Sequence, residues 1–179
     1  MKRNLLVFTV LLTFIFSGCK KDSGDDSNYG TEVNTWTFTE GSNVYKGSLF
    51  FDPILNTYLQ GNNSYTFGFI GEEKTSGYVF NIVLSLLDLN FTTKTYQSGI
   101  IGNAYLNSFY YSDSPASLEN IYESSNIGVT TGAVITYTVS SYDAGKDIVT
   151  ITFNGKVSDK NGNLVNITNG KVTGRIERI

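Results

Sequence analysis

The chain has 179 residues, one cysteine, no histidine and a formal charge of −3 at neutral pH. The lack of histidine excludes Ser-His-Asp and Cys-His catalysis in their usual form, and it removes the commonest transition-metal ligand. The acidic balance leaves no basic stripe to neutralise phosphates, so we expect no nucleic-acid partner. We also predict no cofactor and no metal site.

The N-terminal segment has the layout of a secretory signal peptide. A positively charged start is followed by an apolar run over residues 5–16 and by the small residues Ser17 and Gly18. A transmembrane helix is the alternative, but a run of this length spans only about 18 Å of a hydrocarbon core of about 30 Å. We therefore predict a signal peptide over residues 1–18. Without it, 11 basic and 16 acidic residues remain, for a formal charge of −5.

The only cysteine, Cys19, follows this segment directly. The stretch Phe16-Ser17-Gly18-Cys19 resembles a bacterial lipobox, with Phe16 where leucine is usual. The resemblance implies that the thiol of Cys19 receives a diacylglycerol and that cleavage falls before it. A free thiol is the alternative, because the absence of a second cysteine rules out an internal disulfide. Two or three acyl chains would attach the protein stably to a membrane.

Residues 19–35 carry Cys19 and a predicted flexible tether. The tether is rich in Ser, Gly, Asn and Asp and has no apolar periodicity. The stretch "KKDSGDD" resembles the export tag of Bacteroidetes-type surface lipoproteins, although Ser23 interrupts its acids. The resemblance implies an outer membrane lipoprotein at the cell surface, and an orientation towards the periplasm remains the alternative.

Residues 36–179 have the pattern of a single all-β domain. Apolar and polar residues alternate with period two, which is typical of half-buried strands. The alternation predicts these inward residues: Trp36, Phe38, Tyr45, Leu49, Phe51, Tyr65, Phe67, Phe69, Ala133, Ile135, Tyr137, Val139, Val149, Ile151 and Phe153. The stretch 77–89 is apolar on both faces, which predicts a central strand covered on both sides, with a buried helix as the alternative. We predict an antiparallel β-sandwich of seven to ten strands, with a flattened β-barrel as the alternative.

The connections between these strands carry turn signals. Three Asn-Gly pairs, at 154–155, 161–162 and 169–170, predict type I′ turns. Residues 71–77 and 141–147 predict polar hairpin loops. A calcium loop starting at Asp159 lacks the required Gly and Glu at its sixth and twelfth positions, which favours a hairpin. The stretch 114–126 predicts a short helix, since Ser114-Pro115 can start one.

The C-terminal part carries a second resemblance. Residues 132–176, ending in "ITNGKVTGRI", resemble the C-terminal half of a group of uncharacterised Bacteroidetes-type lipoproteins, with Val172 where Phe is usual. The resemblance implies that the domain finishes in three antiparallel strands, and it carries no catalytic residue.

Paired carboxylates are the enzymatic chemistry that the sequence leaves open. The nearest pairs are Glu72 with Glu73, Asp143 with Asp147, and Glu119 with Glu123. A glycosidase needs two carboxyl groups across a cleft, whereas these pairs occur in polar, turn-like stretches. We therefore predict no catalytic residue.

Adjacent tyrosines provide the candidate ligand-binding residues, Tyr110 and Tyr111. Neighbouring residues on a strand point to opposite faces, so both rings cannot enter one core. We expect Phe109 and Tyr111 to point inwards, with Asn107 at the edge or hydrogen-bonded, and Tyr110 to point outwards. An exposed tyrosine beside Asn and Ser can stack on a sugar ring. The alternative is that the pair bridges two packed layers.

We therefore expect a lipid-anchored cell-envelope protein that acts as a non-enzymatic binding or structural module for a glycan or a surface protein. The alternatives are a carrier of small hydrophobic ligands and a carboxylate-based hydrolase.

Overall fold

The computed structural model describes residues 33–50, 54–59, 64–100, 106–113, 120–125 and 131–178. The predicted signal peptide, Cys19 and most of the predicted tether lie outside the described residues. The described residues form twelve strands: β1 (Thr35–Glu40), β2 (Asn43–Leu49), β3 (Ile54–Leu59), β4 (Ser64–Glu72), β5 (Val79–Leu86), β6 (Thr95–Gln97), β7 (Ser108–Ser112), β8 (Asn120–Ser124), β9 (Ile135–Asp143), β10 (Ile148–Asp159), β11 (Leu164–Arg175) and β12 (Glu177–Arg178). No helix in these ranges is long and apolar enough to cross a membrane.

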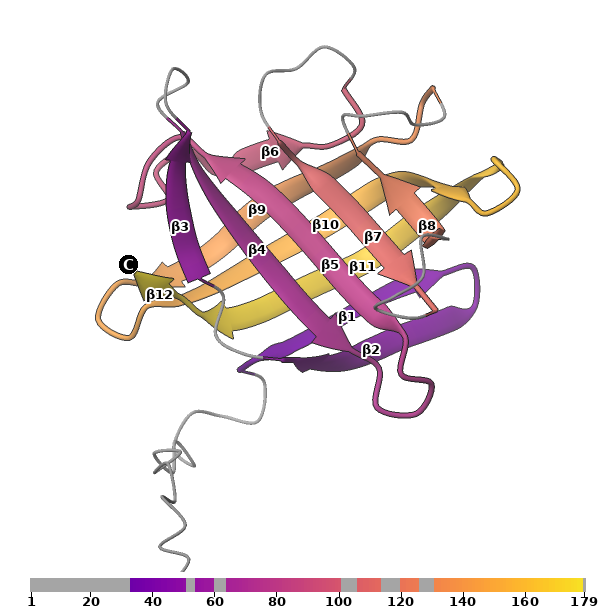
Figure 1. Cartoon of the computed structure of the whole chain (residues 1–179), viewed down its shortest axis with the longest axis horizontal. Helices are drawn as coiled ribbons and strands as arrows, with labels where there is room; N and C mark the ends of the chain where they lie inside the picture. Colours follow the sequence, from indigo (N-terminus) through magenta and orange to yellow (C-terminus); the bar gives the residue numbers. More distant parts are fainter. Residues whose placement is uncertain are drawn as a thin grey trace, which may run out of the picture. The chain divides into compact units, whose positions relative to one another are not determined.

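The strands form one sheet that closes on itself. Eight of them make a ring in the order β11-β1-β2-β4-β5-β7-β8-β10, and β10 pairs again with β11. Each ring strand is antiparallel to both of its neighbours (Figure 1). The prediction of an all-β antiparallel fold is confirmed. Because the sheet closes into a ring, the flattened barrel fits the architecture better than the sandwich.

Two short seams close the ring. One joins β2 to β4 through Ser48–Glu72 and Leu49–Gly71, and the other joins β8 to β10 through two residue pairs. Beyond its seam, β4 pairs with β3, and β10 pairs with β9, which in turn carries β6. The barrel is therefore flattened, because two broad faces meet only along these seams.

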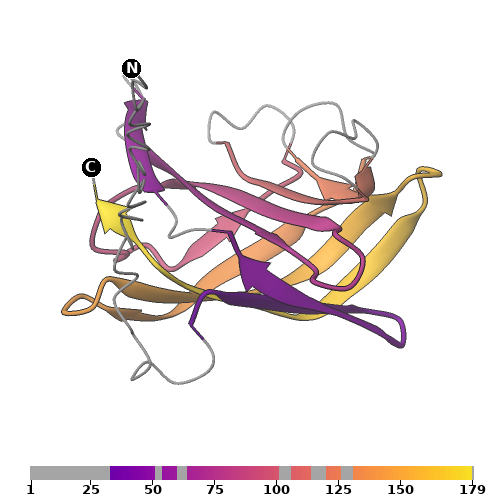
Figure 2. The ribbon, with the colours of Figure 1, turned by 60° about the horizontal axis from the view of Figure 1, so that its bottom comes forward.

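Three tight connections lie at the same end of the barrel, which we call the hairpin end. They join β1 to β2, β4 to β5 and β10 to β11, all of which are antiparallel neighbours in the ring, and β7 ends and β8 begins at the same end. Figure 2 shows these connections together on the right of the view. The turn between β9 and β10 lies at the opposite end.

Aromatic side chains fill the interior of the barrel. Trp36 stacks on Phe80 with ring centroids 4.6 Å apart and an interplanar angle of 6°. Its indole lies against Gly71, where a Cβ atom would come within 2.8 Å of Nε1. The predicted inward residues that the structure describes are buried, except for the partly buried Tyr45 and Tyr65, which pack against the core. Phe51 lies outside the described side chains.

Two predictions about single elements are wrong. The predicted helix over 114–126 is a strand where it is described, since Asn120–Ser124 forms β8 beside β7 and β10. The stretch 77–89 contains a central strand, β5, as predicted, but only one of its faces is covered. Asn81 and Val83 are half-buried on the outer face, and Leu87 just beyond the strand is 43% exposed.

The Asn-Gly pairs behave in two ways. The pair at 161–162 lies in the turn between β10 and β11, but only Gly162 of the pair has a positive φ, so the turn is not of the predicted type I′. The pairs at 154–155 and 169–170 lie inside those two strands, where the register between them shifts, so their turn predictions are wrong. Gly155 and Asn169 have positive φ angles of 146° and 52°. Positive φ suits a β-bulge as well as a type I′ turn, so the dipeptide alone does not distinguish the two.

Candidate functional site

Four tyrosines gather at the hairpin end, and we call them the tyrosine cluster. They are Tyr45 on β2, Tyr78 just before β5, Tyr111 on β7 and Tyr122 on β8. Tyr111 is the centre, with ring centroids 5.1 Å from Tyr45, 5.8 Å from Tyr78 and 6.1 Å from Tyr122. Edge-to-face and offset contacts at these distances stabilise aromatic groups beyond their burial alone. The rings of the cluster therefore pack against one another beneath the hairpins.

Two glutamates accept hydrogen bonds from this cluster. The hydroxyl of Tyr122 donates to Glu40 Oε2 at 3.3 Å and lies 3.2 Å from the hydroxyl of Tyr45. Because a carboxylate oxygen accepts the hydrogen bond, the hydroxyl of Tyr122 donates to Glu40 and accepts a hydrogen bond from the hydroxyl of Tyr45. Tyr111 donates to Glu73 Oε2 at 3.2 Å, and the hydroxyl of Ser76 donates to the same oxygen. The hydroxyl groups of Tyr111 and Tyr122 are thus directed by carboxylates of the neighbouring hairpins.

A pocket of about 480 Å³ opens over the cluster, and we call it the mouth pocket. Most of the residues that line it come from the ends of β1, β8, β10 and β11. They are Glu40, Tyr78, Asp113, Asn120, Ile121, Tyr122, Asp159, Lys160, Asn161 and Val165. Amides, carboxylates and one ammonium group therefore surround two tyrosines.

A smaller pocket of about 370 Å³ adjoins the mouth pocket at the seam between β8 and β10. It shares Asn120, Asp159, Lys160 and Asn161 with the mouth pocket and adds Glu123. Glu123 is the cross-strand neighbour of Tyr110 on the outer face of the barrel. The polar surface therefore runs from the mouth pocket round the seam to Tyr110.

The structure separates Tyr110 from Tyr111, as the alternation predicts. Phe109 and Tyr111 are fully buried, whereas Tyr110 is half-buried on the outer face, with Asn81 as its neighbour on β5. Asn107 is buried and hydrogen-bonded, also as predicted. The ring of Tyr111 belongs to the core, so only Tyr110 of the pair offers a surface for contact. Ligand binding by these residues stays a prediction.

Burial and nearby carboxylates keep the phenols protonated. Burial raises the pKa of Tyr111, and the negative charge and hydrogen bond of Glu73 raise it further. Burial also raises the pKa of Tyr122, with added effects of Tyr45 and Glu40. Both hydroxyls are therefore neutral donors over the physiological pH range.

Asp159 is the carboxylate that closes the hairpin between β10 and β11. Its Oδ1 accepts the N–H groups of Asn161 and Asn163, each at 2.8 Å, and its Oδ2 accepts Asn163 Nδ2 at 3.0 Å. The hydrogen bonds from Asn163 and Asn161 lower the pKa of Asp159. The group is thus ionised at neutral pH and helps to define the rim of the mouth pocket.

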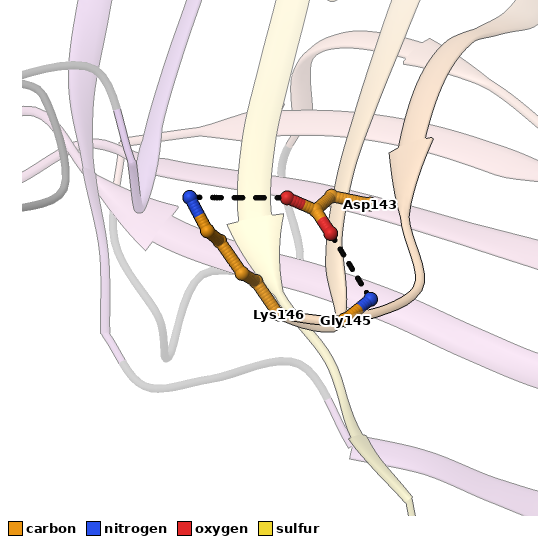
Figure 3. A network of polar contacts seen from close by, with 3 residues as sticks. All are labelled: Asp143, Gly145 and Lys146. Carbon is orange, nitrogen blue, oxygen red and sulfur yellow. Dashed lines mark hydrogen bonds and ion pairs between the residues drawn. The ribbon is translucent and has the colours of Figure 1, made fainter.

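The carboxylate pairs noted in the sequence have local structural roles where they are described. Asp143 accepts the N–H of Gly145 at 3.0 Å and pairs with Lys146 at 3.9 Å in the turn between β9 and β10 (Figure 3). Asp147 accepts the hydroxyl of Tyr142 at 2.8 Å. Glu119 lies outside the described residues. Over the described part of the chain, no three Asp, Glu, His or Cys side chains group together in a way that could hold a metal ion.

Sequence reasoning missed most of the mouth pocket. The alternation predicts that Tyr45 points inwards, but nothing in the sequence shows that it meets Tyr78. Tyr122 falls in the stretch 114–126, for which the sequence predicts a helix, and a helix would not pair it with Tyr111 on β7. A usable signal is that each of these tyrosines stands near the hairpin end of its strand.

The arrangement suits a ligand rich in hydroxyl groups. Planar amides and carboxylates donate and accept at fixed angles, and tyrosine rings offer an apolar surface beside them. Compared with known proteins, the chain has no significant match to any family model, curated protein or solved structure.

Proposed function

We propose that this chain is a lipid-anchored protein of the bacterial cell envelope that binds a glycan at the hairpin end of its barrel. The observation that supports this most is the mouth pocket, where Tyr78 and Tyr122 stand among Asn120, Asn161 and Asp159. Hydroxyl groups of a sugar would hydrogen-bond to the amides and carboxylates, while its apolar face would contact a tyrosine ring. The anchor, the envelope location and the outward display rest on the lipobox and export-tag resemblances around Cys19.

The interior of the barrel favours binding at the mouth over enclosure of a hydrophobic ligand. Phe80 contacts both Phe109 and Phe153 at centroid distances of 6.0 and 6.1 Å, and these last two rings are 5.8 Å apart. Rings at van der Waals contact occupy the space that a carrier would need for its ligand. A carrier function is therefore the weaker proposal.

A hydrolase is also less well supported. Glu40 and Asp159 line the same pocket, but Glu40 accepts from Tyr122 and Asp159 is bound by the backbone of its own turn. A glycosidase needs one carboxyl group with a raised pKa to act as the acid, whereas the pKa of Asp159 is lowered. These carboxylates are better suited to accepting hydrogen bonds from a bound sugar.

Replacing Asn161 with alanine should weaken glycan binding while leaving the fold intact. Asn161 is exposed in both pockets, so its removal should change stability by less than about 0.5 kcal/mol. Loss of an interfacial amide should lower the affinity by about 1–2 kcal/mol, roughly five- to thirtyfold. The measurement is a glycan array with the detergent-solubilised full chain, followed by titration calorimetry on each hit.

Asn166→Ala is the matched control, because Asn166 is an exposed asparagine on β11 outside both pockets. Its affinity should equal that of the wild type. Tyr110→Ala then maps the extent of the site and should weaken binding only to glycans long enough to pass the seam. Equal affinities for the wild type and Asn161→Ala would remove the mouth pocket from the binding surface, and capture of a surface protein instead of a glycan would change the ligand class.

Replacing Cys19 with alanine should block lipid attachment and leave an uncleaved precursor. The lipobox reading makes this thiol the only acceptor, since the chain has no other cysteine. Metabolic labelling with a fatty acid in the producing bacterium measures the outcome. Label that persists in Cys19→Ala would contradict the proposed anchor without bearing on the glycan site.

A further inference from the structure

A second pocket, of about 420 Å³, lies on the outer face of β1, β2 and β11, and we call it the lysine pocket. Its lining residues are Thr35, Trp36, Thr37, Lys46, Gly47, Ser48, Lys74 and Lys171. It shares no residue with the mouth pocket or with the smaller pocket at the seam.

The strand register explains how the lysines converge. Thr37 on β1 pairs with Lys46 on β2 and with Lys171 on β11, so the three residues form one row across the sheet. Neighbouring strands are about 4.8 Å apart, which places the two lysine backbones about 10 Å apart. Lys74, on the connection between β4 and β5, is the third cation of the pocket. Because the register fixes Lys46 and Lys171, their spacing is a property of the fold.

Hydroxyl groups and Trp36 also line the pocket between these cations. On the same face of the sheet, Ser48 pairs with Thr35, and both line the pocket. The hydroxyl of Thr37, between the two strand lysines, donates to the carbonyl of Tyr45 at 3.0 Å. The lining between the lysines is therefore uncharged, and more of it is apolar than polar.

No carboxylate lines the lysine pocket. Glu72 pairs with Ser48 along the β2–β4 seam but is not among the lining residues. Within the described ranges, the ammonium groups of Lys46 and Lys74 have neither a hydrogen bond nor an ion pair, in contrast to Lys146, which pairs with Asp143; Lys171 takes part in another interaction. Three lysines line one pocket on a chain that is acidic overall. A bound anion would relieve their mutual repulsion and would hydrogen-bond to the ammonium groups.

We propose that the lysine pocket binds an oxyanion, such as a sulfate, phosphate or carboxylate group, that is carried on a polysaccharide. The hydroxyl groups of Thr35 and Ser48 would meet the sugar beside its anionic group. A membrane surface is the less suitable occupant, because polybasic membrane-binding segments use about four to eight basic residues, and this pocket has three.

The test uses dextran sulfate, with neutral dextran as its matched uncharged probe and sodium sulfate as the free anion. The full chain in a non-ionic detergent should bind dextran sulfate and not dextran, and the affinity should fall as NaCl is raised from about 50 to about 300 mM. Lys46→Gln and Lys171→Gln keep most of the side-chain volume, and each should weaken binding about fivefold or more through loss of a charge-assisted hydrogen bond. The triple variant with Lys74→Gln should lose binding altogether.

The control is Lys156→Gln, an exposed lysine on β10 that lines neither this pocket nor the mouth pocket. Its affinity should match the wild type, and thermal unfolding should verify that every variant is folded. Unchanged binding by a folded triple variant, or equal losses in Lys156→Gln, would overturn the proposal. Tighter binding to vesicles of anionic lipid than to dextran sulfate would overturn the polysaccharide as the occupant.

This proposal stands apart from the glycan site at the mouth. Asn161→Ala should bind dextran sulfate as the wild type does, because Asn161 belongs to the other pocket. A failure of either site therefore leaves the other to be judged by its own variants.

Discussion

Replacing Asn107 with alanine should destabilise the barrel by about 2–4 kcal/mol, since it removes two hydrogen bonds to backbone groups, one of them buried and the other partly buried. Asn107 is 5% exposed and precedes β7. Its Oδ1 accepts the N–H of Ser85 at 2.8 Å, and its Nδ2 donates to the carbonyl of Gln97 at 2.9 Å. One side chain thus links β5 to the end of β6, where the regular ladder between β5 and β7 has stopped.

Ser85 completes this link from the other side. Its hydroxyl accepts the N–H of Leu106 at 2.8 Å and donates to the carbonyl of the same residue at 2.9 Å. Alanine at 107 leaves that pair intact, so the loss should be confined to the two bonds of the Asn107 amide. The expected fall in melting temperature is about 4–16 °C, from about 2–4 °C per kcal/mol for a domain of this size.

Thermal unfolding by circular dichroism measures this effect. Asn166→Ala is again the control, because Asn166 is an exposed asparagine on β11, and its melting temperature should stay near the wild type. A melting temperature of Asn107→Ala close to that of the wild type would show that water replaces the amide at little cost.

Raising the pH above about 10 should progressively destabilise the barrel and unfold it cooperatively. Burial raises the pKa of Tyr96 to about 12, and the nearby charge of Asp88 adds to the effect. Burial raises the pKa of Tyr111, Tyr122 and Tyr137 as well. The folded state therefore keeps these four protons at a pH where the unfolded chain, with tyrosine pKa values near 10, releases them.

The direction of the effect follows from proton binding. Where the folded state holds more protons than the unfolded state, stability falls as pH rises, by up to about 1.4 kcal/mol per pH unit for each tyrosine. This contribution is fully present below pH 10 and is lost as the pH rises through the folded pKa values. Tyr122 lines the mouth pocket, where water screens the charge, so it should contribute less than the enclosed Tyr137.

Tyrosinate absorbance and circular dichroism, followed together, test this prediction. A step in tyrosinate absorbance above pH 10 should coincide with loss of the β-sheet signal. Tyr96→Phe removes one retained proton and should make the fall in stability with pH less steep. Complete ionisation of the tyrosines near pH 10 with the sheet signal preserved would contradict the expectation.

The alternation of the sequence predicts the faces of the strands because side chains on a strand have period two whatever the strand pairs with. Phe109, Tyr110 and Tyr111 take the faces that their order requires. Strand order and closure depend instead on contacts between distant segments. Two short seams decide between a sandwich and a barrel, and neither seam has a local signal.

The failed predictions share a physical cause. Asn154-Gly155 and Asn169-Gly170 supply the positive φ that a type I′ turn needs, but long strand pairing on both sides uses it for bulges. The stretch 120–124 was read as helical from the spacing of Ile121 and Tyr122, and pairing with β7 and β10 overrides that weak local preference. The lysine pocket likewise exists only through register, since Lys46 and Lys171 are 125 positions apart in the chain.

The placement of the three tight hairpins at one end has a practical consequence for engineering. The eight-strand ring has an even number of strands, so β1 begins and β11 finishes at the end opposite these hairpins. A fusion partner or a sensor-chip linker joined before Val33 or after the last strand would therefore leave the mouth pocket unobstructed. Randomising the hairpins at Gly41-Ser42 and Lys160-Asn161 would vary the rim while the ring stays constant, which makes this barrel a scaffold for selecting new binders.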